Sequence, residues 1–121
     1  MQEQELSSPD VSELNRIKTI SMLYEGASNF TKVAKKKMEL GDSTGKSHYI
    51  RKTSAIIKEL SGSLNMDTGE ISRNLRRLYD FVLRSLVTAE TQNDLKALSD
   101  AEKVIEILES AWKEMQEVKK Y

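Results

Sequence analysis

The stretch NLRRLYDFVLRSL, from Asn74 to Leu86, decides the fold of this 121-residue chain. Its apolar side chains recur every three or four residues, and the series extends from Ile71 to Ala89. Because an α-helix turns once in about 3.6 residues, this spacing puts them on one face of a helix. The stretch therefore predicts a long amphipathic helix. Its predicted core-facing members are Ile71, Leu75, Leu78, Val82, Ser85 and Ala89.

Three further series with the same spacing predict three further helices. Short connections between amphipathic helices favour antiparallel neighbours, so the predicted fold is all-α, an antiparallel up-down four-helix bundle. The first of these series is Ile17, Ile20, Tyr24, Ala27, Thr31, Ala34 and Met38, the second is Ile50, Thr53, Ile57, Leu60 and Leu64, and the last is Leu98, Ala101, Ile105, Leu108, Trp112 and Met115.

The connection between the first and second predicted helices lies in ELGDSTGKS. Gly41 suits a helix end, because glycine adopts the left-handed conformation that commonly terminates a helix. The next helix is expected to start at Asp42, Ser43 or Thr44, whose side-chain oxygens can accept from its first N–H groups.

The two later connections carry weaker signals. Gly62 falls where a C-cap or a kink is expected, and Asp67 with Glu70 three residues on resembles a capping box. The last connection has no glycine or proline, but Asn93 or Asp94 can cap the final helix.

A chain of this length is expected to form one domain. The segment 1–11 contains Glu3, Glu5 and Asp10 and offers only Leu6 and Val11 for burial. Ordering it would gain little against a backbone entropy cost of about 1–2 kcal/mol per residue. We therefore expect a flexible acidic N-terminal segment at 1–11 and a helical bundle domain at 12–121.

The charges balance, with 19 basic and 19 acidic residues, but they are unevenly distributed. Residues 32–58 hold eight bases and two acids, whereas 90–117 holds eight acids and three lysines. Such runs are usually solvated helix faces. The basic pair Arg76 and Arg77 points in two directions about 100° apart and has Asp80 nearby, so we expect no nucleic-acid partner.

Several classes of function find no support in the sequence. There is no cysteine, which excludes disulfides and thiolate chemistry, and no Glu-x-x-His pair for a di-iron site. No apolar run approaches the roughly 20 residues that cross a bilayer, and the amino terminus does not resemble a secretory signal. We expect a cytoplasmic protein without membrane insertion, metal or cofactor. A phosphotransfer domain using His48 stays open as a minor alternative.

Some helices carry a second apolar stripe beside the first. Leu23 and Phe30 flank the first series, and Tyr79 and Leu86 flank the third. A wide core-facing stripe is one interpretation, since such helices often use about three positions per heptad. The other is a groove between helices that receives apolar side chains of a partner, with tyrosine at its edge.

Several short motifs, taken in order and spacing, resemble those of the flagellin-specific export chaperone family, FliS. The resemblance covers nearly the whole helical part of the chain, from about Ile20 to Met115. The matching pieces are MLYEGA at 22–27, IIKEL at 56–60 followed by Ser63-Leu64, GEISRNL at 69–75 leading into LYDF at 78–81, and Ala111-Trp112.

The resemblance implies a non-enzymatic antiparallel bundle that needs no cofactor. It implies binding of the disordered carboxy-terminal segment of flagellin, protection from early polymerisation and delivery to the flagellar type III export apparatus. Export-gate components would be a second class of partner. An adaptor for another coiled-coil client is the alternative with the same fold. The candidate client-binding residues are Leu23, Tyr24, Phe30, Asn74, Leu78, Tyr79, Val82 and Leu86, with Asn74 bonding to the client backbone.

Overall fold

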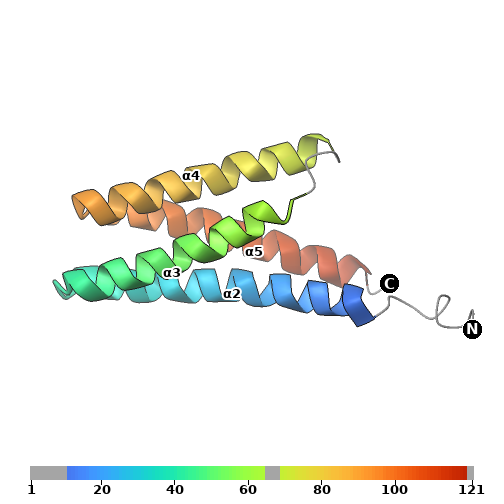
Figure 1. Cartoon of the computed structure of the whole chain (residues 1–121), viewed down its shortest axis with the longest axis horizontal. Helices are drawn as coiled ribbons and strands as arrows, with labels where there is room; N and C mark the ends of the chain where they lie inside the picture. The colour runs from blue at the N-terminus through green and yellow to red at the C-terminus, as the bar shows by residue number, and fades with distance from the viewer. Residues whose placement is uncertain (1–10, 65–68, 120–121) are drawn as a thin grey trace, which may run out of the picture.

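The computed structural model describes residues 11–64 and 69–119, which form four helices. They are α2 (Val11–Glu39), α3 (Ser43–Gly62), α4 (Glu70–Gln92) and α5 (Leu95–Lys119), and the described part of the chain contains no strand. Successive helices run in opposite directions (Figure 1), which confirms the predicted up-down four-helix bundle. Both α2 and α4 pack against α3 and α5, so the helices form a closed ring.

One end of the bundle, at the left of Figure 1, holds the two shortest connections and is called the closed end here. Asp42 is the N-cap of α3, and its Oδ1 accepts from the Gly45 N–H at 2.9 Å, as predicted. Asn93 or Asp94 was expected to cap α5, and the structure assigns this role to Asp94, while Asn93 is the C-cap of α4. Asn93 ends α4 in the left-handed conformation, with φ 52°, and Asp94 Oδ1 accepts from the Ala97 N–H at 3.1 Å.

A buried lysine joins the two connections of the closed end. The Lys46 side chain is 6% exposed, and its Nζ donates to the Glu90 carbonyl at 3.2 Å and to Asn93 Oδ1 at 3.0 Å. A cation at the carboxyl end of a helix stabilises it by about 0.3–1 kcal/mol, because the exposed carbonyls there carry partial negative charge. Lys46 thus holds the start of α3 against the end of α4.

The opposite end, called the open end, contains the start of α2, the end of α3, the start of α4 and the end of α5. The helix α3 ends at Gly62, where a C-cap was predicted, with Ser63 at the cap. The predicted capping box is wrong. Gly69 occupies the N-cap of α4 at φ 101°, a conformation that favours glycine, and makes no side-chain cap bond; Asp67 lies outside the described residues.

The core confirms three of the four predicted stripes, except for Met115 at the end of the last, which is exposed, and it corrects the third. In α4 Val82 and Ala89 are buried as predicted. At three other positions the buried residue is one later than predicted, so that Ile71 and Leu78 are exposed. This register buries the larger Tyr79 and Leu86 in place of Leu78 and Ser85, and it brings the Tyr79 hydroxyl to the hydroxyl of Tyr24. The buried residues of α4 are Ser72, Tyr79, Val82, Leu86 and Ala89.

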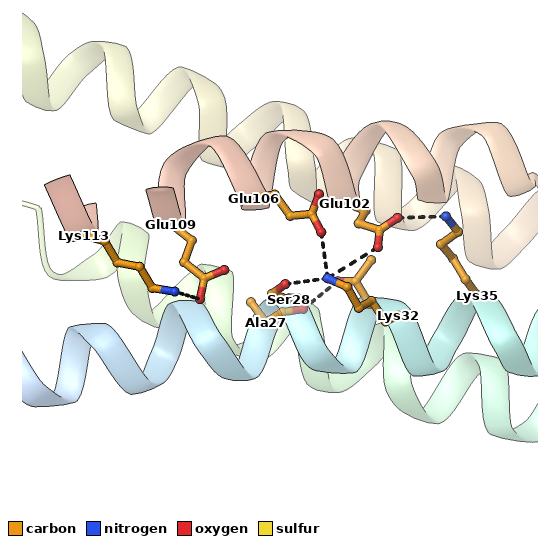
Figure 2. A network of polar contacts seen from close by, with 9 residues as sticks. Ala27, Ser28, Lys32, Lys35, Glu102, Glu106, Glu109 and Lys113 are labelled. Carbon is orange, nitrogen blue, oxygen red and sulfur yellow. Dashed lines mark hydrogen bonds and ion pairs between the residues drawn. The ribbon is translucent and has the colours of Figure 1, made fainter. Parts of the chain in front are cut away.

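The basic and acidic runs of the sequence meet across helix pairs. Between α2 and α5, Lys32 Nζ lies 2.7 Å from Glu106 Oε2, and Lys35 Nζ lies 2.8 Å from Glu102 Oε1 (Figure 2). The hydrogen bond to Glu106 is the main reason why the pKa of Lys32 is raised. Between α3 and α4, Arg51 pairs with Glu90 at 3.0 Å. The uneven charge distribution therefore reflects pairing between helices as well as solvated faces.

Candidate functional site

A cavity of about 460 Å³ opens between all four helices at the open end of the bundle. It is called the end cavity here. Most of its walls are apolar, and among the described residues that line it Arg16 is the one that carries a charge. The lining residues are Arg16, Ile20, Tyr24, Leu60, Ser63, Leu64, Ile71, Ser72, Leu75, Tyr79, Leu108, Ala111, Trp112 and Met115.

Two buried tyrosines from opposite helices meet beside this cavity. The Tyr24 hydroxyl of α2 and the Tyr79 hydroxyl of α4 lie 2.6 Å apart, and the side chains are 5% and 2% exposed. Burial raises the pKa of both phenols; the mutual hydrogen bond raises that of Tyr79 further and partly offsets the rise at Tyr24. The pair links α2 and α4, which lie diagonally opposite each other in the ring of helices.

Trp112 of α5 forms another wall of the end cavity. Its ring is tilted by 40° against the Tyr24 ring, with the centroids 6.3 Å apart, and its Nε1 donates to Ser21 Oγ at 2.8 Å. Tilted aromatic pairs at this distance contribute about 0.5–1.5 kcal/mol beyond their burial. The indole and the two phenols therefore form a fixed inner surface contributed by three helices.

The rim of the end cavity exposes apolar side chains to solvent. Ile71, in the first turn of α4, is 76% exposed, and Met115, near the end of α5, is 52% exposed. An exposed isoleucine alone needs no explanation, but apolar residues gathered at the mouth of an apolar cavity mark a binding site. The geometry suits an apolar segment of another chain rather than a charged small molecule.

The raised pKa values of the tyrosine pair predict how stability depends on alkaline pH. The unfolded chain releases phenolic protons near pH 10, whereas the folded protein holds them to higher pH. The stability that the raised pKa values contribute is fully present below about pH 10. It is lost as pH rises above that, and the free energy of unfolding falls by up to about 1.4 kcal/mol per pH unit for each phenol. Urea unfolding at pH 9 and pH 11 measures this loss.

The variant Tyr79→Phe supplies the comparison for that measurement. It should be less stable at pH 9 by about 1 kcal/mol, because the hydrogen bond to Tyr24 is lost. Between pH 9 and pH 11 it should lose less stability than the unsubstituted protein, since one shifted phenol is gone. Equal losses in the two proteins would contradict the assignment to this pair.

The structure brings two of the eight predicted client-binding residues into the end cavity, Tyr24 and Tyr79. Val82 and Leu86 have no exposed surface and lie in the core. Leu23 is half-buried against that core. Contact between a client and any of these residues stays a prediction, and for Val82 and Leu86 it would require the helices to move apart.

The remaining three candidates lie outside the end cavity. Phe30 is half-buried against Tyr49, with ring centroids 5.8 Å apart, and Lys52 Nζ lies 5.2 Å from the Phe30 centroid. Asn74 is exposed, and its Oδ1 accepts from Arg77 at 2.8 Å. Leu78 is 41% exposed on α4. A client role for these three also stays a prediction.

Sequence reasoning missed most of the end cavity, although a signal was present. Its apolar walls come from the end members of each helical series: Ile20, Leu64, Leu75 and Trp112 are examples. In an up-down bundle the start of one helix lies beside the end of the next, so these end members meet in space. Large apolar residues that continue a series to its last turn, where fewer neighbours remain to cover them, indicate such a site.

His48 lies elsewhere, in a shallow depression on the outer side of α3. It is exposed and stands edge-on to Tyr49, with ring centroids 4.9 Å apart. Residues of a single helix line this depression: Ser43, Thr44, Ser47, His48, Arg51, Lys52 and Ala55. Groups from a second element do not converge on it.

Residues 11–64 and 69–119 contain no group of three or more His, Cys, Asp or Glu residues placed to hold a metal ion. No helix within them is long and apolar enough to cross a membrane.

The described part of the chain is a four-helix bundle with an apolar cavity, the candidate site, at one end. A family model described as flagellar protein FliS matches residues 2–119, and the chain belongs to this family. Three curated relatives carry the name flagellar secretion chaperone FliS. The protein of Salmonella typhimurium is 34% identical over 79% of this chain and 73% of its own length. The proteins of Bacillus subtilis and Vibrio cholerae are 33% and 34% identical, over 77% and 78% of this chain and 69% and 71% of their own lengths.

Proposed function

We propose that this protein is a cytoplasmic export chaperone for flagellin. It binds the disordered carboxy-terminal segment of flagellin, prevents premature polymerisation and assists delivery to the flagellar type III export apparatus. Family membership supports this function, since the relatives are named secretion chaperones. The observation that carries it is the end cavity, whose apolar walls come from four helices and whose rim exposes Ile71 and Met115.

The proposed mechanism is competitive burial of apolar surface. Segments that assemble into a filament must bury apolar side chains against neighbouring subunits. A chaperone that covers those side chains first removes the driving force for assembly. The client segment becomes ordered on binding, which consumes part of the contact energy, so the complex can still dissociate at the export apparatus. No catalytic step is required.

Within this proposal the client contacts centre on the open end. Tyr24 and Tyr79 keep the role that the sequence predicts, and Leu78 can extend the contact along α4 because it is exposed. To them we add the walls and rim of the end cavity, chiefly Ile71, Trp112 and Met115. The client would lie across the starts of α2 and α4 and the ends of α3 and α5.

Isothermal titration with a peptide covering the carboxy-terminal segment of the host's flagellin tests the proposal. We expect saturable one-to-one binding with a negative heat-capacity change, because apolar surface leaves water. A peptide of the same composition in scrambled order is the control and should not saturate. If neither peptide binds, the client is another protein, and an adaptor role for a different coiled-coil client becomes the better explanation.

A further inference from the structure

The hydroxyl pair of Tyr24 and Tyr79 contains one more proton than its hydrogen bond uses. Each phenol has one O–H and can also accept. At 2.6 Å one hydroxyl donates to the other, and either can be the donor. Whichever donates, the O–H of its partner is left over. The pair therefore always has one donor to offer.

The mutual bond is the one hydrogen bond that either hydroxyl makes with residues 11–64 and 69–119, so the second O–H is not used within the described part of the protein. Both side chains are more than nine-tenths buried, at 5% and 2% exposure, so neither stands free in bulk solvent. In the free protein water in the open cavity can accept this bond. A client that displaces the water without supplying an acceptor leaves the donor unpaired, which is costly.

The end cavity is where a partner for this donor can enter. Both tyrosines line it, and most of its other walls are apolar, with Ser63 and Ser72 as its uncharged polar residues among those described. The hydroxyl that accepts the mutual bond is also polarised by it, which strengthens its own O–H as a donor. The cavity thus combines apolar walls with one oriented donor.

We propose that the tyrosine pair donates a hydrogen bond to a carbonyl oxygen of the client segment in the end cavity. This inference rests on the proposed function and specifies how the same site recognises its ligand. The occupant is an apolar peptide segment that presents one carbonyl oxygen, from its main chain or from an Asn or Gln side chain. A wholly apolar stretch whose carbonyls are all used within its own helix would leave the donor unpaired and bind less well.

Titration of the flagellin peptide into tyrosine-to-phenylalanine variants tests the inference. Either single variant, Tyr24→Phe or Tyr79→Phe, keeps one hydroxyl that can donate, so its Kd should rise about twofold to threefold. The double variant loses the donor and leaves the client carbonyl buried without a partner. Its Kd should rise about tenfold. The matched control Tyr49→Phe removes a hydroxyl outside the end cavity and should leave Kd unchanged.

A second arm locates the acceptor by coupling. Peptides with single amide-to-ester replacements carry a weaker main-chain acceptor at a known position, and Asn or Gln replaced by Leu removes a side-chain carbonyl. The replacement that weakens binding to the unsubstituted protein but not to the double variant identifies the acceptor. If an ester replacement has this effect, the acceptor is the main-chain carbonyl at that position. If an Asn or Gln replacement has it, the acceptor is that side-chain amide.

The possible outcomes separate this inference from the proposed function. If the unsubstituted protein fails to bind the peptide, the proposed function falls and the inference with it. If the double variant binds within twofold of the unsubstituted protein, the inference alone is overturned. Should the double variant lose its helical circular dichroism, the two single variants carry the test. Each keeps one donor, so one acceptor replacement should still weaken peptide binding to both, and the lack of any such effect in both overturns the inference.

Discussion

Replacing Leu86 by Asp is expected to unfold the protein, not merely to weaken its binding to a client. Leu86 has no exposed surface and lies in the core of α4. The substitution removes a buried apolar side chain and puts a carboxylate among apolar neighbours, where its charge finds no water. We expect a loss of about 4 kcal/mol or more, against typical domain stabilities of about 5–15 kcal/mol. Urea unfolding followed by circular dichroism measures it.

The control for this experiment is Leu78→Asp on the same helix. Leu78 is 41% exposed, so the new carboxylate can remain in water and the helix content should be retained. This pair of variants also tests the register of α4. If Leu86→Asp folds normally while Leu78→Asp unfolds, the sequence-based register is right and the buried face of α4 is misassigned.

The double variant Ile71→Asp and Met115→Lys is expected to abolish peptide binding while the fold is retained. Both side chains are exposed at the rim of the end cavity. An acid in the first turn of α4 and a base near the end of α5 each suit the dipole of their helix, so stability should change little. Losing two apolar contacts and desolvating two charges should raise Kd about 100-fold or more.

A matched control places the same charges on the same helices away from the end cavity. Val87 of α4 is 60% exposed and Ile107 of α5 is 66% exposed, and neither lines the cavity. The double variant Val87→Asp and Ile107→Lys should bind the peptide with unchanged Kd. Equal loss of binding in both double variants would move the client site away from the open end. Titration calorimetry and circular dichroism on the two proteins decide between these outcomes.

The sequence predicts the architecture well because helical periodicity is a local property. Series such as Ile50 to Leu60 reappear as buried faces, and Asp42 caps its helix as expected. The register of α4 could not be read in the same way. Two apolar series run along that helix, and the choice between them depends on Tyr24 and Trp112 across the bundle, which the sequence of α4 does not contain.

For the candidate site, too, the sequence predicts some of the residues but not how they meet in the folded chain. Tyr24 and Tyr79, which the sequence predicts as client-binding residues, both line the end cavity. The sequence does not show that their hydroxyls meet, because they are 55 positions apart in the chain. Val82 and Leu86 shared the predicted groove with Tyr79, but lie deeper in the core, toward the closed end, and have no exposed surface.

The difference between the two ends of the bundle has a mechanical consequence. Asn93 and Lys46 fix α4 at the closed end, and the 23 residues of this helix extend about 34 Å toward the open end. A tilt of α4 by about 5° around Asn93 would displace its first turn by about 3 Å, but would move Ala89 by only about 0.5 Å. Such a tilt would change the width of the cavity mouth by about 3 Å and leave the packing beside the pivot almost unchanged.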